Sequence, residues 1–181
     1  MTGERWCIWG LQGSTDGRTR WRMAAMAAGL PGFGWELTAT LATLGSDAHW
    51  PHTMVVWRIP DETALTRWLE ADGHDGFDEE QVVEGVARLY RRARGELPPG
   101  ADAFLVEHVV VDATDALERM DGPDLVLVEE FAPWQGLLVW AAPDLFALAE
   151  REIAGVGSMR DPACRQVMGW WATRMPEREI V

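Results

Sequence analysis

The stretch that decides the fold is Val56-Trp57-Arg58-Ile59-Pro60-Asp61-Glu62-Thr63-Ala64-Leu65, whose pattern predicts a strand, a Pro-Asp turn and the start of a helix. The pattern returns 83 residues later as Val139-Trp140-Ala141-Ala142-Pro143-Asp144-Leu145-Phe146-Ala147-Leu148, with six of ten positions identical. Proline ends a strand because it lacks an amide hydrogen, and aspartate is a favoured helix cap. Two copies at one offset indicate an internal duplication.

The residues around the first copy predict more strands. Short apolar or alternating runs favour strands at 6–11, 35–42 and 53–59. The loop 45–51 is short, so we expect the last two strands to be antiparallel neighbours. A helix is predicted at 18–29, where apolar residues have helical spacing before a Gly and Pro stop.

Three further helices are predicted from start signals and apolar stripes. The first follows Asp61 and has Ala64, Leu65, Trp68 and Leu69 on one face. The second begins at Asp78, which forms a capping-box pattern with Gln81, and ends at Gly95. The third closes the chain, from Asp161-Pro162 to Pro176.

The second half shows the same order in a shorter form. Strands are predicted at 104–111, 125–131 and 137–141, with a short helix at 115–120 and another helix from Asp144. Each half therefore has the strand and helix order of a ferredoxin-like unit. We predict an α+β fold of two ferredoxin-like halves, with antiparallel sheets packed or joined and helices on the outer faces.

The stretch Leu97-Pro98-Pro99-Gly100 is the best candidate for a linker. It divides the chain into one ferredoxin-like half at 1–96 and a second half, with the C-terminal helix, at 103–181. We expect the two halves to form one compact unit.

A longer segment carries a family resemblance. Val55-Val56-Trp57-Arg58-Ile59-Pro60-Asp61-Glu62-Thr63-Ala64-Leu65-Thr66-Arg67-Trp68-Leu69, followed by His74, resembles the strand-to-helix segment of the dimeric α+β barrel superfamily. That superfamily includes antibiotic-biosynthesis monooxygenases and haem-degrading monooxygenases. The likeness covers residues 33–80 and implies a pocket between each sheet and its helices. The second copy has no histidine that matches His74, so the implied site belongs to the first half.

Charge and composition exclude several functions. Twenty-nine acidic against sixteen basic side chains give a net charge of -13, which opposes binding to nucleic acid or to anionic membranes. All the basic residues are arginine, so a P-loop lysine and a lysine Schiff base are excluded. Cys7 and Cys164 are far apart in the sequence, which favours neither a thiolate zinc site nor a disulfide scaffold. The N-terminus has no apolar signal segment, so we expect a cytoplasmic protein. We expect it to be a monomer or a homodimer.

The eleven tryptophans suggest what kind of ligand the protein binds. Indoles form flat apolar walls that suit a hydrophobic, aromatic small molecule. Trp35, Trp57, Trp68 and Trp171 are the candidate substrate-binding tryptophans, together with Arg58. The alternative is that these indoles only fill the core.

Two histidines are the catalytic candidates. His74 lies in a glycine-flanked loop and, by the resemblance, is a haem ligand or general base; alternatively it is a solvated loop residue between Asp72 and Asp75. His108 and Glu107 should point to opposite faces of one strand, so that one of them is buried. His108 is either an acid-base group or a core histidine with a satisfied hydrogen bond. No pattern of metal ligands is present, and we predict no metal.

These features favour a small-molecule tailoring enzyme, monooxygenase-like or cyclase-like, without a tightly bound organic cofactor. One alternative is a non-catalytic ligand-binding or protein-interaction module. The other is a haem protein with His74 as the axial ligand, but the acidic residues around His74 would repel the haem propionates.

Overall fold

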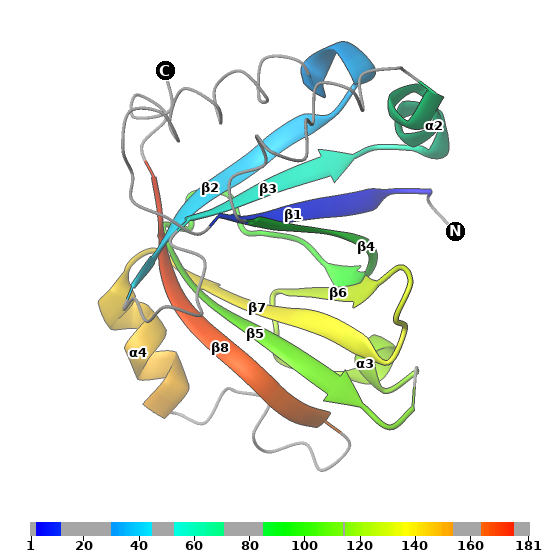
Figure 1. The fold of residues 1–181 in the computed structure, drawn as a ribbon. Coiled ribbons are helices and arrows are strands. Elements are labelled where there is room, and N and C mark those ends of the chain that lie inside the picture. Colours follow the sequence, from blue (N-terminus) through cyan, green and yellow to red (C-terminus); the bar gives the residue numbers. More distant parts are fainter. Residues whose placement is uncertain are drawn as a thin grey trace. The chain divides into compact units, whose positions relative to one another are not determined.

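The fold is α+β, with antiparallel strands and helices that pack on sheet faces (Figure 1). The computed structural model describes residues 3–11, 30–44, 53–70, 85–113, 115–153 and 164–175. Its elements in chain order are β1 (Arg5–Leu11), η1 (Leu30–Phe33), β2 (Glu36–Leu44), β3 (Thr53–Ile59), α2 (Glu62–Glu70), β4 (Gly85–Gly95), β5 (Ala103–Val111), α3 (Ala116–Arg119), β6 (Leu125–Glu129), β7 (Gln135–Ala142), α4 (Leu145–Ile153) and β8 (Cys164–Arg174). Within the described residues, no helix is long and apolar enough to cross a membrane.

The chain divides into two units. The first contains β1, β3, α2 and β2 as far as Ala42, and the second contains residues 89–174 with the end of β2. In the first unit β3 is the central strand, and it pairs antiparallel with β1 on one side and β2 on the other. In the second unit β5 pairs antiparallel with both β7 and β8, and β7 pairs with β6, which pairs with β4.

Each face of the first sheet has its own set of side chains. Arg5 lies 3.8 Å from Glu62 of α2, so α2 packs on the face of β1 that also holds Cys7. Trp57 is the register partner of Cys7 and therefore shares this helix-covered face. Trp6 and Arg58, which are also register partners, lie on the opposite face.

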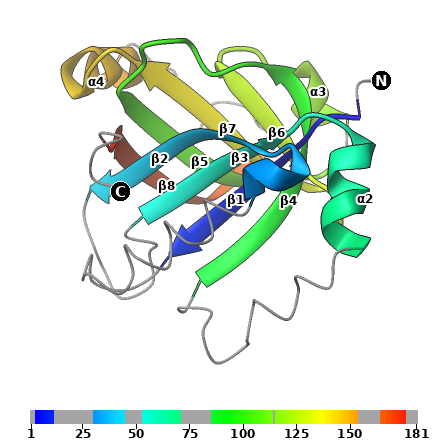
Figure 2. The ribbon, with the colours of Figure 1, turned by 90° about the horizontal axis from the view of Figure 1, so that it is seen from above.

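The core of the second unit lies between its sheet and α3 and α4. Alternate residues of β5 contribute, among them Leu105 and Val109, and the helices add Leu117 and Leu148. Figures 1 and 2 show α4 next to β5 and β7. Burying these side chains away from water is the main contribution to the stability of the unit.

The two copies of the repeated stretch have the same local structure. Asp61 Oδ1 accepts the amide hydrogen of Ala64 at 2.8 Å, and Asp144 Oδ1 accepts that of Ala147 at 2.8 Å. Each aspartate thus caps the helix that follows its strand, α2 after β3 and α4 after β7.

Two helix predictions are wrong. The segment predicted as a helix from Asp78 to Gly95 is strand β4 from Gly85 onward, and the closing helix is strand β8. β4 forms backbone hydrogen bonds with β6, and β8 pairs along β5. Pairing with a strand that is distant in sequence outweighs the local helical spacing.

The other predicted helices and strands agree more closely with the structure. The predicted strands near 6–11, 35–42, 53–59, 104–111 and the pair around 125–141 are all present, with ends shifted by a few residues. The helices after Asp61, near 115–120 and after Asp144 are present as well. The helix predicted at 18–29 and the loop 45–51 lie outside the described residues apart from their margins.

Candidate functional site

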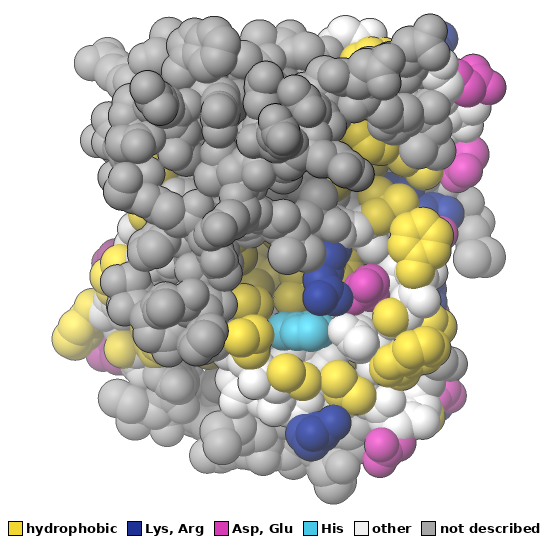
Figure 3. Space-filling model, viewed as in Figure 1, with side chains coloured by type: hydrophobic (Ala, Val, Ile, Leu, Met, Phe, Trp, Pro, Cys, Tyr) yellow, Lys and Arg dark blue, Asp and Glu magenta, His cyan; other side chains and the backbone are white. Residues whose placement is uncertain are grey.

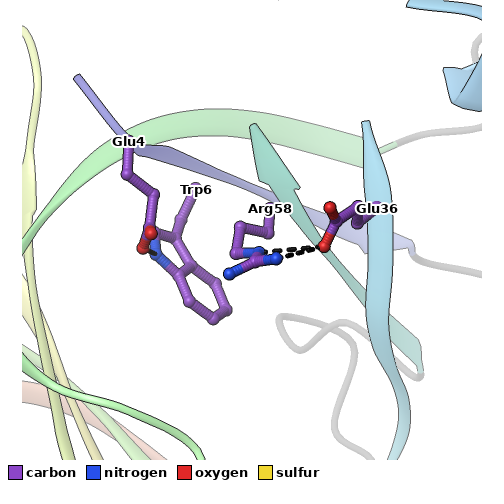
Figure 4. Close-up of polar contacts among 4 residues, drawn as sticks. All are labelled: Glu4, Trp6, Glu36 and Arg58. Atoms are coloured by element: carbon purple, nitrogen blue, oxygen red, sulfur yellow. Dashed lines mark hydrogen bonds and ion pairs between the residues drawn. The ribbon is translucent and has the colours of Figure 1, made fainter. Parts of the chain in front are cut away.

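Four residues at one end of the first sheet form a polar group, which we call the Arg58 cluster: Glu4, Trp6, Glu36 and Arg58 (Figure 4). Arg58 on β3 is the register partner of Trp6 on β1 and of Glu36 on β2. Glu4 precedes Trp6 by two residues and therefore projects from the same face. Three different segments of the chain thus meet at one arginine.

Arg58 binds Glu36 through one edge of its guanidinium group. Its Nε donates to Glu36 Oε2 at 3.0 Å, and its Nη2 donates to the same oxygen. The hydrogen bond to Glu36 is the main cause that raises the pKa of Arg58; burial lowers it, and the charges of Glu36 and Glu4 raise it further. Arg58 is therefore a permanent cation.

The third guanidinium nitrogen is available for a ligand. Nη1 of Arg58 has no hydrogen-bond partner among the residues that the structure describes. Figure 4 shows the guanidinium group between Glu36 and the indole of Trp6. The Arg58 side chain is 40% exposed and that of Glu36 is 54% exposed, so a molecule in solution can reach both.

Glu4 supplies a fixed negative charge behind Arg58. It is 9% exposed, and one of its oxygens accepts the indole hydrogen of Trp6 at 2.9 Å. A buried carboxylate requires such donors because it has lost its water. Trp6 itself is buried, so it supports the cluster rather than presenting an open face.

The second copy of the repeat provides an internal comparison for Arg58. Ala141 of β7 occupies the position of Arg58, and the strand, turn and capped helix still form. A strand, Pro-Asp turn and capped helix of this kind therefore form without an arginine at this position.

Three of the predicted tryptophans lie in the first unit. Trp35 is 2% exposed, its Nε1 donates to the backbone oxygen of Ala64 at 3.4 Å, and its ring centroid lies 5.0 Å from that of Trp68. Trp57 is 1% exposed and lies on the opposite face of the sheet from Arg58. The structure thus brings Trp35 and Trp68 together but separates Trp57 from Arg58.

Trp171 lies in the second unit, on strand β8 rather than on the predicted closing helix. It is half-buried and packs against the core between the sheet and its helices. It therefore belongs to a different unit from the other candidate tryptophans.

His108 is half-buried on β5, and Glu107 beside it is the buried member of the pair, at 3% exposed. The prediction that these neighbours point to opposite faces is confirmed. His108 Nε2 lies 3.0 Å from Gln135 Oε1. This contact fixes the orientation of the imidazole ring on β5. Hydrophobic side chains gather over β5 and β8 on the face that Figure 3 shows.

The haem hypothesis finds no support in the described residues. His74 lies outside them, as do His49 and His52. His108, the one described histidine, contacts Gln135 through Nε2. In the described part of the chain, no group of three or more His, Cys, Asp or Glu side chains is placed to hold a metal ion.

Sequence reasoning missed three members of the cluster: Glu4, Trp6 and Glu36. The alternation along the strands indicates which face each residue shares within its own strand, but not its partner on the next strand. The register that aligns Glu36 with Arg58 depends on a bulge between Leu37 and Ala39 of β2. No signal in the sequence locates that bulge.

Comparisons with known proteins identify the fold. No family model matches the sequence, and no curated protein matches it. A variant chlorite dismutase from Candidatus Nitrospira defluvii, solved with cyanide, is similar with a TM-score of 0.60 and 12% identity, over 99% of this chain and 93% of that one. An anthrone oxidase-like protein has a TM-score of 0.55 and 11% identity, over 97% and 94%. A candidate monooxygenase from Lactobacillus acidophilus has a TM-score of 0.53 and 12% identity, over 97% and 94%. At these identities the similarity shows the fold alone.

Proposed function

We propose that this chain is a monooxygenase-like enzyme that acts on a hydrophobic, aromatic small molecule. The observation that carries the proposal is Arg58, which the second copy of the repeat lacks and whose Nη1 has no partner within the described part of the chain. A cation in a partly buried group of polar residues is typical of a ligand site. The fold that the chain shares with an anthrone oxidase-like protein and with candidate monooxygenases supports this class of reaction.

The proposed reaction needs only the substrate and molecular oxygen. A reduced aromatic compound with a methylene group next to a carbonyl system reacts as R–CH2–R′ + O2 → R–C(=O)–R′ + H2O. The methylene carbon loses two hydrogens and four electrons. One oxygen atom enters the product, and the other leaves as water with both hydrogens. Arg58 would bind the substrate oxygen through Nη1 and stabilise negative charge that develops there.

The candidate histidines keep their proposed roles, and the candidate tryptophans do not. His108 and His74 are both proposed as acid-base groups. The four tryptophans are not proposed to contact a ligand at Arg58: Trp35 and Trp57 are buried, Trp68 packs on Trp35 on the helix-covered side of the sheet, and Trp171 lies in the other unit.

A specific observation also favours a second candidate, a protein-interaction or ligand-binding module. Phe131 and Trp134, between β6 and β7, are exposed, as is Phe146 at the start of α4. In the first copy of the repeat, Thr63 occupies the position of Phe146, so the fold does not require an aromatic residue there. Exposed aromatic side chains are common in binding surfaces.

Oxygen uptake with anthrone as the probe tests the proposed reaction. We expect the wild-type protein to raise oxygen uptake above the spontaneous rate and to yield the ketone product, and Arg58→Ala to lose about tenfold of that rate. Arg67→Ala is the matched control, because Arg67 is an exposed arginine on α2 outside the cluster. If anthrone and related polycyclic ketones neither bind nor consume oxygen, the enzyme proposal is wrong and the binding module is favoured.

A further inference from the structure

The ion pair with Glu36 leaves one edge of the Arg58 guanidinium group unused. Nε donates to Glu36 Oε2 at 3.0 Å, and Nη2 donates to the same oxygen, so both hydrogen bonds lie on the Nε–Nη2 edge. The other N–H groups belong to Nη1 and Nη2, and two of them run parallel on the Nη1–Nη2 edge. No residue in the described part of the chain accepts a hydrogen bond from this second edge.

A carboxylate fits the open edge of Arg58. The two parallel N–H groups match the spacing of its two oxygens, and such charge-assisted pairs are stronger than hydrogen bonds between neutral groups. A single ketone oxygen would leave one of these N–H groups to water. A carboxamide has the shape of a carboxylate, but its NH2 group is itself a donor and cannot accept the second hydrogen bond. The edge therefore favours a carboxylate over neutral groups.

Arg58 is held in place before a ligand arrives. It projects from β3, which pairs with a strand on each side, and Glu36 of β2 binds its guanidinium group. Figure 4 shows Glu36 on one side of this group and the indole of Trp6 on the other. A side chain that is already ordered loses little conformational freedom on binding, which favours affinity.

The charge of Glu36 does not prevent a second carboxylate from binding. The Glu36 side chain is 54% exposed, so water and salt screen its charge, and the Arg58 side chain is 40% exposed, so a ligand can reach it. A phosphate dianion would bring twice the charge of a carboxylate into a chain whose net charge is -13. The site is therefore better suited to a singly charged anion.

We propose that the Nη1–Nη2 edge of Arg58 is a carboxylate-binding site, and that the substrate carries a carboxylate group. This inference rests on the proposed function, because it identifies the substrate oxygen at Nη1 as one of the two oxygens of a carboxylate. Ala141 at the corresponding position of the second copy has no such edge, so this contact is specific to the first copy of the repeat.

Two ligands of the same shape test the inference. 9-Fluorenone-4-carboxylate presents two equivalent oxygens, and 9-fluorenone-4-carboxamide has an NH2 group in place of one of them on the same rings. We expect calorimetric titration of the wild-type protein to show at least about fivefold tighter binding of the carboxylate. Equal affinities, or tighter binding of the carboxamide, would overturn the inference without the use of any variant.

Arg58→Lys separates the two-pronged contact from the effect of charge. Lysine keeps the positive charge but presents a single ammonium group in place of the planar fork. The affinity for the carboxylate should fall about five- to tenfold, whereas that for the parent ketone, 9-fluorenone, should change less than about threefold. If Arg58→Lys binds the carboxylate as tightly as the wild-type protein does, charge alone attracts the ligand and the inference is wrong.

Arg67→Lys is the matched control. Arg67 is an exposed arginine on α2, outside the Arg58 cluster, so the same exchange should leave both affinities unchanged. A loss of carboxylate affinity in Arg67→Lys equal to that in Arg58→Lys would show that the open edge of Arg58 does not set the preference, and would overturn the inference.

The outcomes separate this inference from the proposed function. If the wild-type protein binds 9-fluorenone and both derivatives without preference, the carboxylate site is wrong while ligand binding stands. If it prefers the carboxylate through Arg58 but never raises oxygen uptake with anthrone, the site stands and the proposed reaction fails. If it binds none of the ligands, both fail. A thermal unfolding scan identifies any variant that has lost its fold, and the preference of the wild-type protein then decides.

Discussion

Arg58 should bind its ligand equally well over a broad range of pH. The hydrogen bond to Glu36 raises the pKa of Arg58 above its ordinary value, so the guanidinium group keeps its proton as the pH rises from 6 to 9 and would lose it only in far stronger base. We expect the affinity for 9-fluorenone, measured by titration, to stay within about twofold over that range. Arg58→Ala should bind more weakly at every pH. A steep fall in wild-type affinity between pH 6 and 9 would contradict a site that depends on this arginine.

Gly95 should tolerate no side chain. Its φ of +74° lies in the left-handed region, and an added Cβ would lie 1.9 Å from the backbone oxygen of Asp124. We expect Gly95→Ala to lower the free energy of unfolding by about 3 kcal/mol, measured by urea denaturation, because strain and overlap add together. Gly32→Ala is the control, since no atom lies within 4 Å of its added Cβ, and it should change stability by less than about 0.5 kcal/mol. Equal stability of the two variants would contradict the close approach at the end of β4.

At the scale of elements, the two Asp-capped helices should respond alike to loss of the cap. Each aspartate accepts one backbone amide hydrogen at 2.8 Å, from Ala64 in α2 and from Ala147 in α4. Asp61→Ala and Asp144→Ala should therefore each lower stability by about 1 kcal/mol in urea denaturation, while the asparagine variants retain most of it. If only one of the two alanine variants is destabilised, the turns are not equivalent, and the case for duplication is weakened.

Strands β4 and β8 were predicted as helices, and β4 shows why the local pattern was misleading. Val86, Leu89 and Tyr90 have helical spacing, yet the described part of this segment is a strand. Tyr90 is buried and lies opposite Glu129 of β6, and Arg94 binds Asp121, which follows α3. Backbone pairing and these contacts arise only when residues that are distant in sequence have already come together.

For the whole molecule, the charge imbalance predicts a response to salt. Twenty-nine acidic and sixteen basic side chains leave a net charge of -13, and this repulsion opposes the folded state. Raising sodium chloride from 10 to 150 mM should raise the thermal unfolding midpoint, because screening weakens the repulsion more than it weakens the few exposed ion pairs. Potassium chloride at the same ionic strength should have the same effect. A midpoint that falls with salt would show that the ion pairs dominate.

The repeated strand, Pro-Asp turn and helix could be read from the residues because every signal in it is local. Proline removes a donor, aspartate caps amides three positions on, and Ala64 and Leu65 mark the buried face of α2. The α+β class and the order of most elements follow from such signals.

Only the tertiary structure decided which residues meet Arg58. Glu4 and Trp6 come from the start of β1 and Glu36 from β2, and their meeting with Arg58 of β3 depends on strand order and register, including the bulge in β2. It also decided that Trp35 and Trp57 are buried and that β4 and β8 are strands. The physical reason is that a local pattern sets the conformation of one segment only. The partners of a side chain across a sheet depend on how separate segments pair, and no single position in the sequence specifies that pairing.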